Sequence, residues 1–194
     1  KYAISDRAGV FHEKTPDDMH RRLAREFARI ESNYQNAMGE EEIYLLLKDF
    51  SKIVPQGSPM AGIGNDYQIQ SISNCFVIES PWDSYGGILK TDQELVQIAK
   101  RRGGIGFDIS NIRPKGQVFM DRFSNSCREV AQGGRRGALM MTISVHHPQI
   151  RDFIKIKRSL TRVTGANVSI RLTDEFMNAV KNNTDVELRW PVES

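Results

Sequence analysis

The sequence has little cysteine and no long apolar run. Its only cysteines are Cys75 and Cys127, and neither belongs to a CxxC or Cys/His spacing. Two cysteines cannot build a disulfide framework, and their setting excludes the usual structural zinc sites. No window approaches the ~18 consecutive apolar residues of a membrane-spanning helix, and the first residues do not resemble a signal peptide. We therefore expect neither a structural zinc nor a membrane span, with the cytoplasm as the default location.

The net charge is small as well, because 27 basic and 24 acidic residues leave a formal net charge of only +3. A continuous nucleic-acid-binding groove is therefore not expected. With 39% hydrophobic and 26% charged residues, the composition is that of a globular protein. The basic residues form small clusters beside glycines, which suit the phosphates of small molecules. These clusters are 100–102, Arg113 with Lys115, 135–136, and 155–158.

Residues 1–54 are expected to form a helical N-terminal region. Thr15 is a typical N-cap, Pro16 suits the first helical position, and two aspartates follow in the first turn. The apolar residues that share one face of this helix are Met19, Leu23, Phe27 and Ile30. A second helix is expected from residue 40 to about residue 53, with Ile43, Leu46, Leu47 and Phe50 facing inward.

Residues 55–194 are expected to form a second domain, which opens on a loop at 55–66 and then alternates strands with helices. The expected strands are 72–78, 105–109, 139–145, 167–172 and 186–190. The expected helices are 84–101, 118–131, 148–157 and 173–181. Five strands joined by helical crossovers predict an α/β fold with a largely parallel sheet.

Two loops combine arginine with paired glycines, at 101–106 and at 132–138. Glycine lets backbone N–H groups approach a ligand closely, and a guanidinium group matches the geometry of phosphate. Helix termination is the alternative interpretation, since glycine commonly follows a helix and arginine complements the helix dipole. Neither loop has the P-loop or GxGxxG fingerprint. Two such loops in one chain nevertheless favour ligand binding.

The cysteines and a pair of histidines have structural interpretations too. A free cysteine is commonly a small buried hydrophobe, and Cys127 keeps that interpretation. Cys75 lies in the strand-like run SNCFV, where either a buried or a functional thiol fits. His146 and His147 directly precede Pro148, so they indicate a strand end and a helix entry rather than a metal site.

Six short motifs, taken in order, resemble one known family. They are Ser58-Pro59-Met60, Ser73-Asn74-Cys75-Phe76-Val77, Asp83-Ser84, Arg102-Gly103-Gly104-Ile105-Gly106, Ile112-Arg113-Pro114-Lys115-Gly116 and Gln132-Gly133-Gly134-Arg135-Arg136-Gly137-Ala138. The resemblance is to the large catalytic subunit of ribonucleotide reductases, closest to the adenosylcobalamin-dependent class. It implies a ten-stranded α/β barrel made of two sets of five parallel strands. The five expected strands would form the first half-barrel, preceded by the small helical region.

The resemblance implies thiyl-radical chemistry. In the family, a thiyl radical abstracts the ribose 3′ hydrogen, the 2′ hydroxyl leaves as water, and a cysteine pair supplies two electrons and becomes a disulfide. Cys75 matches the first member of that reducing pair. Asn74 and Ser58 match positions that contact the substrate, with Ser58 near its phosphates. Gly104 matches a glycine whose backbone lies close to the substrate.

A second set of residues matches the site for an allosteric effector, a deoxynucleoside triphosphate or ATP. These residues are Asp83, Ser84, Tyr85, Arg113, Lys115, Gln132, Arg135 and Arg136. Asp83 and Ser84 match positions that hold the deoxyribose and base, and Arg113 matches a phosphate ligand. The loop 132–136 resembles the one that transmits effector identity to the substrate base.

The resemblance also implies a cofactor and partners. Adenosylcobalamin is the expected radical source, and a separate metal-containing subunit is the alternative. The substrate would be a ribonucleoside di- or triphosphate, and a thioredoxin- or glutaredoxin-like protein would reduce the cysteine pair again. The helices after Asp83 and near Val118 would build a homodimer interface.

Two departures from the family pattern leave other functions open. The radical cysteine and the second reducing cysteine of the family lie on later strands than this sequence contains, so the chain is expected to be inactive without a complementing C-terminal chain. The flexible effector loop after Gly116 is shorter than in relatives. A non-catalytic nucleotide-binding module is therefore the alternative function, and a glycyl-radical enzyme, which shares the barrel, is a third.

Overall fold

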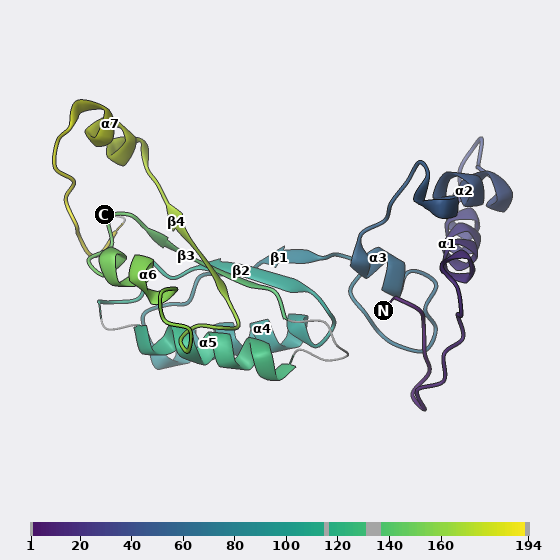
Figure 1. The fold of residues 1–194 in the computed structure, drawn as a ribbon, viewed down its shortest axis with the longest axis horizontal. Coiled ribbons are helices and arrows are strands. Elements are labelled where there is room, and N and C mark those ends of the chain that lie inside the picture. The colour runs from purple at the N-terminus through teal and green to yellow at the C-terminus, as the bar shows by residue number, and fades with distance from the viewer. Residues whose placement is uncertain (1, 115–116, 131–136, 193–194) are drawn as a thin grey trace. The chain divides into compact units, whose positions relative to one another are not determined.

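The structure is a computed structural model that describes residues 2–114, 117–130 and 137–192. The described chain forms two compact units, the first ending at Asn74 and the second beginning at Cys75. The units are groups of packed residues, and the domain boundary expected between residues 54 and 55 stays a prediction. Figure 1 shows the elements of both units in chain order.

The first unit begins with α1 (Pro16–Glu31), which starts as expected. The Thr15 hydroxyl accepts a hydrogen bond from the Asp18 N–H at 3.2 Å, and the Asp18 carboxylate accepts one from the Thr15 N–H at 2.9 Å. This capping box satisfies backbone N–H groups that have no partner within the helix. Of the residues expected to share one face of α1, Met19 and Leu23 are buried, whereas Ile30 is 42% exposed.

That second helix, α2 (Glu40–Leu47), ends six residues earlier than expected. A short 3₁₀ turn, η1 (Lys48–Phe50), follows. The α-helical path ends at Lys48, where ψ is 131°, and positive φ angles of 55° and 54° follow at Asp49 and Phe50. Ile43 and Leu47 are buried as predicted, and Leu46 is partly buried. Phe50 is 39% exposed instead of facing inward. A further helix, α3 (Gly57–Gly62), lies in the stretch expected to be a loop.

The second unit contains a parallel sheet with helical crossovers, as predicted. Its strands are β1 (Cys75–Val77), β2 (Gly104–Asp108), β3 (Leu139–Ser144) and β4 (Asn167–Arg171), in the order β1-β2-β3-β4. Its helices are α4 (Tyr85–Ala99), α5 (Gln117–Val130), α6 (Ile150–Ile156) and α7 (Asp174–Asn182). Every neighbouring pair of strands is parallel, so each connection must cross back over the sheet.

The fifth expected strand, 186–190, does not form in the described part of the chain. Its backbone is hydrogen-bonded beyond the end of β3 instead of beside β4. The Arg189 N–H donates to the His146 carbonyl at 2.8 Å, and His146 Nδ1 donates to the Glu187 carbonyl at 3.1 Å. The Arg189 guanidinium also binds the Glu175 carboxylate at 2.8 and 3.1 Å, which ties the segment to α7.

The two faces of the sheet differ in chemistry. One face packs against α4 and α5, which lie together on one side of the sheet in Figure 1. Its core includes Phe107 and Phe123, whose rings meet edge to face with centroids 4.9 Å apart. The other face is called the open face here. It carries the strand residues that alternate with the core, namely Cys75, Val77, Gly104, Gly106, Asp108, Met140, Thr142, Ser144, Asn167, Ser169 and Arg171.

Candidate functional site

Cys75 is the first residue of β1 and its side chain is exposed. It is paired in register with Gly104, and Val77 is paired with Gly106. Glycine at both partner positions leaves the surface beside the thiol without side chains. The interpretation of Cys75 as a buried hydrophobe is therefore wrong. A thiol on an open strand is accessible to a substrate and to a reductant, as a redox cysteine must be.

Cys127 is the contrasting case. It is fully buried in α5, and burial raises the pKa of its thiol. Because the thiolate is the reactive form, a buried thiol with a raised pKa is inert near neutral pH. The interpretation of Cys127 as a small core hydrophobe is confirmed.

Ser58 and Asn74 are brought together within the first unit. The Ser58 N–H donates to Asn74 Oδ1 at 3.0 Å, and the Asn74 amide also donates to Gln56 Oε1. Ser58 is 1% exposed, and its hydroxyl has no hydrogen-bond partner among the described residues. A buried hydroxyl without a partner is uncommon in native proteins. Asn74 then leads directly into Cys75.

An ion pair in α1 and the loop before it holds the helix that carries Ser58. Arg22 donates to the Met60 carbonyl at 2.7 Å and to the Ile63 carbonyl, at the C-terminal end of α3. Its Nε lies 2.6 Å from the Glu13 carboxylate, which is itself buried. A buried, hydrogen-bonded pair of this kind fixes geometry more than it adds stability. The position of Ser58 is thus set from α1, a link that the sequence did not indicate.

The residues expected to bind the effector also come together, in the second unit. Arg113 lies thirty residues beyond Asp83, and its backbone N–H donates to Asp83 Oδ1 at 3.1 Å while its Nε donates to Oδ2 at 2.7 Å. The Arg113 side chain is largely exposed, so this ion pair contributes at most about 1 kcal/mol and can open for a phosphate at little cost. Arg113 is therefore held beside Asp83 by an ion pair that is weak enough to break when a phosphate binds.

Ser84 and Tyr85 complete this cluster at the start of α4. The Ser84 hydroxyl caps the helix by accepting from the Gly87 N–H at 3.0 Å. A side-chain carbon at Gly87 would lie 2.7 Å from the Trp82 carbonyl, so glycine is required for this close turn. Tyr85 is 78% exposed and its ring meets Phe119 of α5 at 6.1 Å. An exposed aromatic ring beside Asp83 and Arg113 offers a stacking surface for a nucleotide base.

The first glycine-arginine loop is used partly for helix termination. Arg101 donates to the Gln97 carbonyl at 3.0 Å, in the last turn of α4. Gly103 is required sterically, because a side-chain carbon there would lie 2.5 Å from Ile98 and 2.8 Å from the Phe76 ring. The helix-terminating interpretation therefore explains Arg101 and Gly103, while Gly104 lies in β2 beside Cys75. Four expected effector residues, Lys115, Gln132, Arg135 and Arg136, lie outside the described residues.

Sequence reasoning missed the polar residues of the open face. The Thr142 hydroxyl donates to Asp108 Oδ2 at 2.8 Å, and Arg171 Nε lies 3.9 Å from the same oxygen. These side chains come from β2, β3 and β4. The missed signal was the period of two in each strand, which assigns them to the same face as Cys75.

Two features of the described chain concern other classes of site. Within residues 2–114, 117–130 and 137–192, no three His, Cys, Asp or Glu side chains gather in a group that could hold a metal ion. Nor is any helix in that part of the chain both long and apolar enough to cross a bilayer.

The family comparison agrees with this arrangement. A family model described as "Ribonucleotide reductase, barrel domain" matches residues 73–194, which is more than half of the chain and includes the whole sheet. The chain belongs to the ribonucleotide reductase family. The resemblance carried by the six motifs is thereby confirmed.

Named relatives support the same family. A vitamin B12-dependent ribonucleoside-diphosphate reductase of Mycobacterium tuberculosis is 28% identical over 201 residues, covering 94% of this chain and 28% of the relative. One from Thermoplasma acidophilum is 32% identical over 153 residues, covering 71% of this chain and 20% of the relative. A ribonucleoside-diphosphate reductase large subunit of Arabidopsis thaliana is 29% identical over 142 residues, covering 63% of this chain and 17% of the relative. The chain thus spans less than a third of these ribonucleotide reductases.

Proposed function

We propose that this chain is a segment of a ribonucleotide reductase catalytic chain, and that the complete enzyme reduces ribonucleoside di- or triphosphates to 2′-deoxyribonucleotides. The observation that carries the proposal is the exposed thiol of Cys75, which lies beside Gly104 and directly follows Asn74. In the proposed reaction a thiyl radical on another part of the enzyme takes the 3′ hydrogen and the 2′ hydroxyl leaves as water. Cys75 and a second cysteine supply two electrons and form a disulfide.

The residues of the first unit would orient the substrate in this proposal. Ser58 would contact a phosphate of the substrate, and its hydroxyl has no hydrogen-bond partner among the described residues. The Asn74 side chain, held by the Ser58 N–H, would contact the ribose next to Cys75. A protein reductant of the thioredoxin or glutaredoxin type would then reduce the disulfide, which requires the accessibility that Cys75 has.

Adenosylcobalamin is our proposed radical source, because the relatives from Mycobacterium tuberculosis and Thermoplasma acidophilum are named as vitamin B12-dependent. This group would supply the initiating radical. The described residues contain no group of metal-ligating side chains, so they do not fit a metal centre, and no step at these residues is assigned to the cofactor. A separate metal-containing radical subunit is the alternative within the family.

The test is reconstitution with a complementing C-terminal chain, assayed for deoxynucleotide formation with a dithiol reductant. Cys75→Ser should abolish multiple turnover because the reducing pair loses one thiol. Cys127→Ala is the matched control and should retain turnover, since its thiol is buried. Unchanged dithiol-driven turnover in Cys75→Ser would show that the assigned role is wrong.

We also propose that Asp83, Ser84, Tyr85 and Arg113 bind a deoxynucleoside triphosphate or ATP as effector. Their support is the contact of Arg113 with Asp83 beside an exposed aromatic ring. Titration with dATP, dTTP and dGTP should show binding, and Arg113→Ala should weaken it about tenfold by removing a charge-assisted phosphate contact. Arg151→Ala is a control, because Arg151 is an exposed arginine on α6. Binding without turnover in the reconstituted protein would favour the non-catalytic nucleotide-binding module.

A further inference from the structure

The short segment 109–112 connects β2 to Arg113 and is anchored on β3. The Ile109 N–H donates to the Thr142 carbonyl at 2.9 Å. The Ser144 N–H donates to the Ser110 hydroxyl at 2.7 Å, and both serines are buried. These bonds extend the β2–β3 pairing past the end of β2. They leave the following peptide, between Ile112 and Arg113, to be held by other groups.

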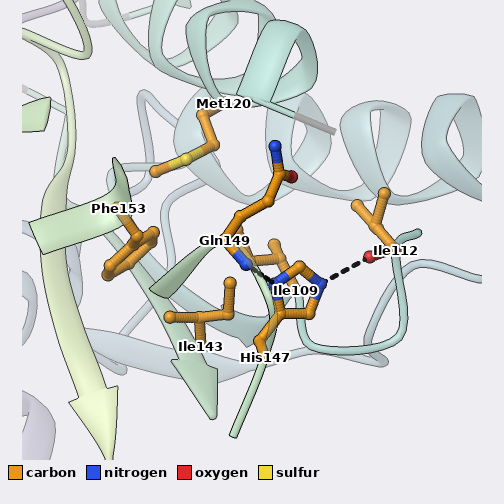
Figure 2. Close-up of a pocket in the computed structure, with 7 residues that line it drawn as sticks. All are labelled: Ile109, Ile112, Met120, Ile143, His147, Gln149 and Phe153. Carbon is orange, nitrogen blue, oxygen red and sulfur yellow. Dashed lines mark hydrogen bonds between the residues drawn. The ribbon is translucent and has the colours of Figure 1, made fainter. Parts of the chain in front are cut away.

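His147, just beyond β3, holds that peptide. Its side chain is 2% exposed, its Nε2 lies 2.9 Å from the Ile112 carbonyl oxygen, and its Nδ1 lies 3.1 Å from the Gln149 backbone nitrogen. Figure 2 shows both interactions on opposite sides of the ring. A carbonyl oxygen only accepts and a backbone N–H only donates. The ring must therefore carry its proton on Nε2 and accept at Nδ1.

The Ile112 carbonyl and the Arg113 N–H belong to the same peptide group. His147 binds the oxygen of this group, and Asp83 binds its N–H at 3.1 Å. Because a peptide group is planar, fixing both ends sets its orientation about the chain. The Arg113 side chain branches from the Cα next to this peptide group, and its Nε donates to the other oxygen of Asp83. His147, which follows β3, thus helps to fix the direction in which the Arg113 side chain leaves the backbone.

The surroundings of His147 keep the ring in place. A cavity of about 20 Å³ beside it is lined by Ile109, Ile112, Met120, Ile143, Gln149 and Phe153. Figure 2 shows the ring among these side chains, which come from the segment after β2, from β3, from α5, and from α6 and the residue before it. A lining of this kind offers few other hydrogen-bond partners, so turning the ring would leave its N–H and the Ile112 carbonyl unpaired. Such unpaired buried groups are costly.

We propose that His147 is a positioning residue for the nucleotide site at Asp83 and Arg113, acting through the Ile112–Arg113 peptide. The inference rests on the proposed effector function of that site. It assigns His147 a part in nucleotide affinity although the ring touches neither Asp83 nor Arg113. The histidine pair that sequence reasoning took for a strand end and helix entry then contains a residue with a role in binding.

Two substitutions separate the hydrogen bonds of His147. His147→Gln places an amide N–H near the position of Nε2, so it can still donate to Ile112. His147→Asn places an amide oxygen near the position of Nδ1, so it can still accept from Gln149 but no longer reaches Ile112. Binding of dATP, dTTP and dGTP is measured for both variants, for Arg113→Ala and for the unmodified chain. We expect His147→Asn to bind about tenfold more weakly and His147→Gln to stay within about threefold.

The outcomes distinguish the inference from the function on which it rests. Tight binding by His147→Asn, together with weak binding by Arg113→Ala, would overturn the role of His147 and leave the effector site intact. Equal weakening by Asn and Gln would also overturn it, since packing alone would then explain the effect. If the unmodified chain binds none of the three nucleotides, both the proposed effector site and the inference about His147 are contradicted.

A measurement without substitutions covers the case in which His147→Asn does not fold. The imidazole ¹⁵N signals of the unmodified chain should show a neutral ring protonated on Nε2. Saturating dTTP, or whichever of the three nucleotides binds, should shift the Nε2 signal because it changes the contacts of the Arg113 peptide. An Nδ1-protonated ring, or an Nε2 signal that does not move at saturation, would contradict the proposal.

Discussion

At the scale of single residues, His147 shows how a buried titratable group can serve as a fixed donor. Burial lowers its pKa, which outweighs the opposing effects of the Ile112 carbonyl and of the Asp108 charge. The ring is therefore neutral at physiological pH and keeps one tautomer. Protonation would add a hydrogen at Nδ1, directly opposite the Gln149 N–H, so the charged ring would lose that bond.

This arrangement predicts a pH dependence of stability. Because the pKa of His147 is lower in the folded chain than its ordinary value of 6.5, the unfolded chain binds the proton more readily. The contribution of His147 to the free energy of unfolding is therefore fully present above pH 6.5 and is lost as the pH falls from there through the folded pKa. Urea denaturation at pH 7.5, 6.5 and 5.5 measures this loss.

His147→Gln is the control, because glutamine keeps the donor to Ile112 and does not titrate. Its free energy of unfolding should change less between pH 7.5 and 5.5 than that of the unmodified chain. Carboxylates with lowered pKa values, such as that of Glu175 beside Arg189, titrate at lower pH and affect both proteins alike. Parallel pH profiles for the two proteins would contradict the prediction.

At the scale of elements, helix starts could be predicted better than helix ends. Thr15, Ser84 and Thr173 each cap the helix that follows, and hydroxyl N-caps are visible in the sequence. The end of α2 depends on the non-helical ψ of 131° at Lys48 and on the positive φ angles that follow at Asp49 and Phe50, and neither lysine nor phenylalanine signals such a change in the sequence. The helix α3 is short and depends on Arg22 from α1, so its formation is a tertiary effect.

The strands show the same division between local and distant causes. Four of them could be predicted from apolar runs, and their parallel order follows from the crossovers. The start of β1 moved from the expected residue 72 to Cys75, because the Ser71 hydroxyl accepts from the Ser73 N–H at 3.1 Å and makes a local turn. The segment 186–190 has a strand-like composition, but its backbone is used by His146. A local turn decided the first case, and contacts between distant residues decided the second.

The start of α4 carries an exposed apolar surface, formed by Trp82, Tyr85 and Leu89. Adjacent apolar residues of this size on a surface commonly mark an interaction site. We expect α4 and α5 to build the homodimer interface that the family resemblance implies. Leu89→Glu should raise the dimer dissociation constant about tenfold or more, because a carboxylate would be buried without a partner. Sedimentation equilibrium measures the change.

Leu160→Glu is the matched control, since Leu160 is 93% exposed in the connection between α6 and β4. Both substitutions replace exposed leucines, so each should change the free energy of unfolding by no more than about 0.5 kcal/mol. An equal change in dimerisation for the two variants would argue against α4 as the interface.

At the scale of the whole molecule, the helices α4 and α5 pack on the same side of the sheet in the described part of the second unit. Parallel sheets are almost always buried on both faces. Here the open face carries Cys75, together with Val77, which is 91% exposed. The edge of β4 has no further strand beside it in the described part of the chain. These features are those of a barrel segment whose remaining strands come from elsewhere, and they agree with a match to the family's barrel domain.

A complementing C-terminal chain should therefore cover the open face and stabilise the protein. Mixing with the C-terminal part of the Mycobacterium tuberculosis relative is expected to raise Tm, by roughly 2–4 °C for each kcal/mol gained in a protein of this size. Alkylation of Cys75 by iodoacetamide should slow in the complex, because access to its thiol becomes restricted, while Cys127 stays unreactive in both states. If the two chains associate but Cys75 reacts as fast as before and Tm does not rise, the partner binds elsewhere. The open face would then not be the interior of a barrel.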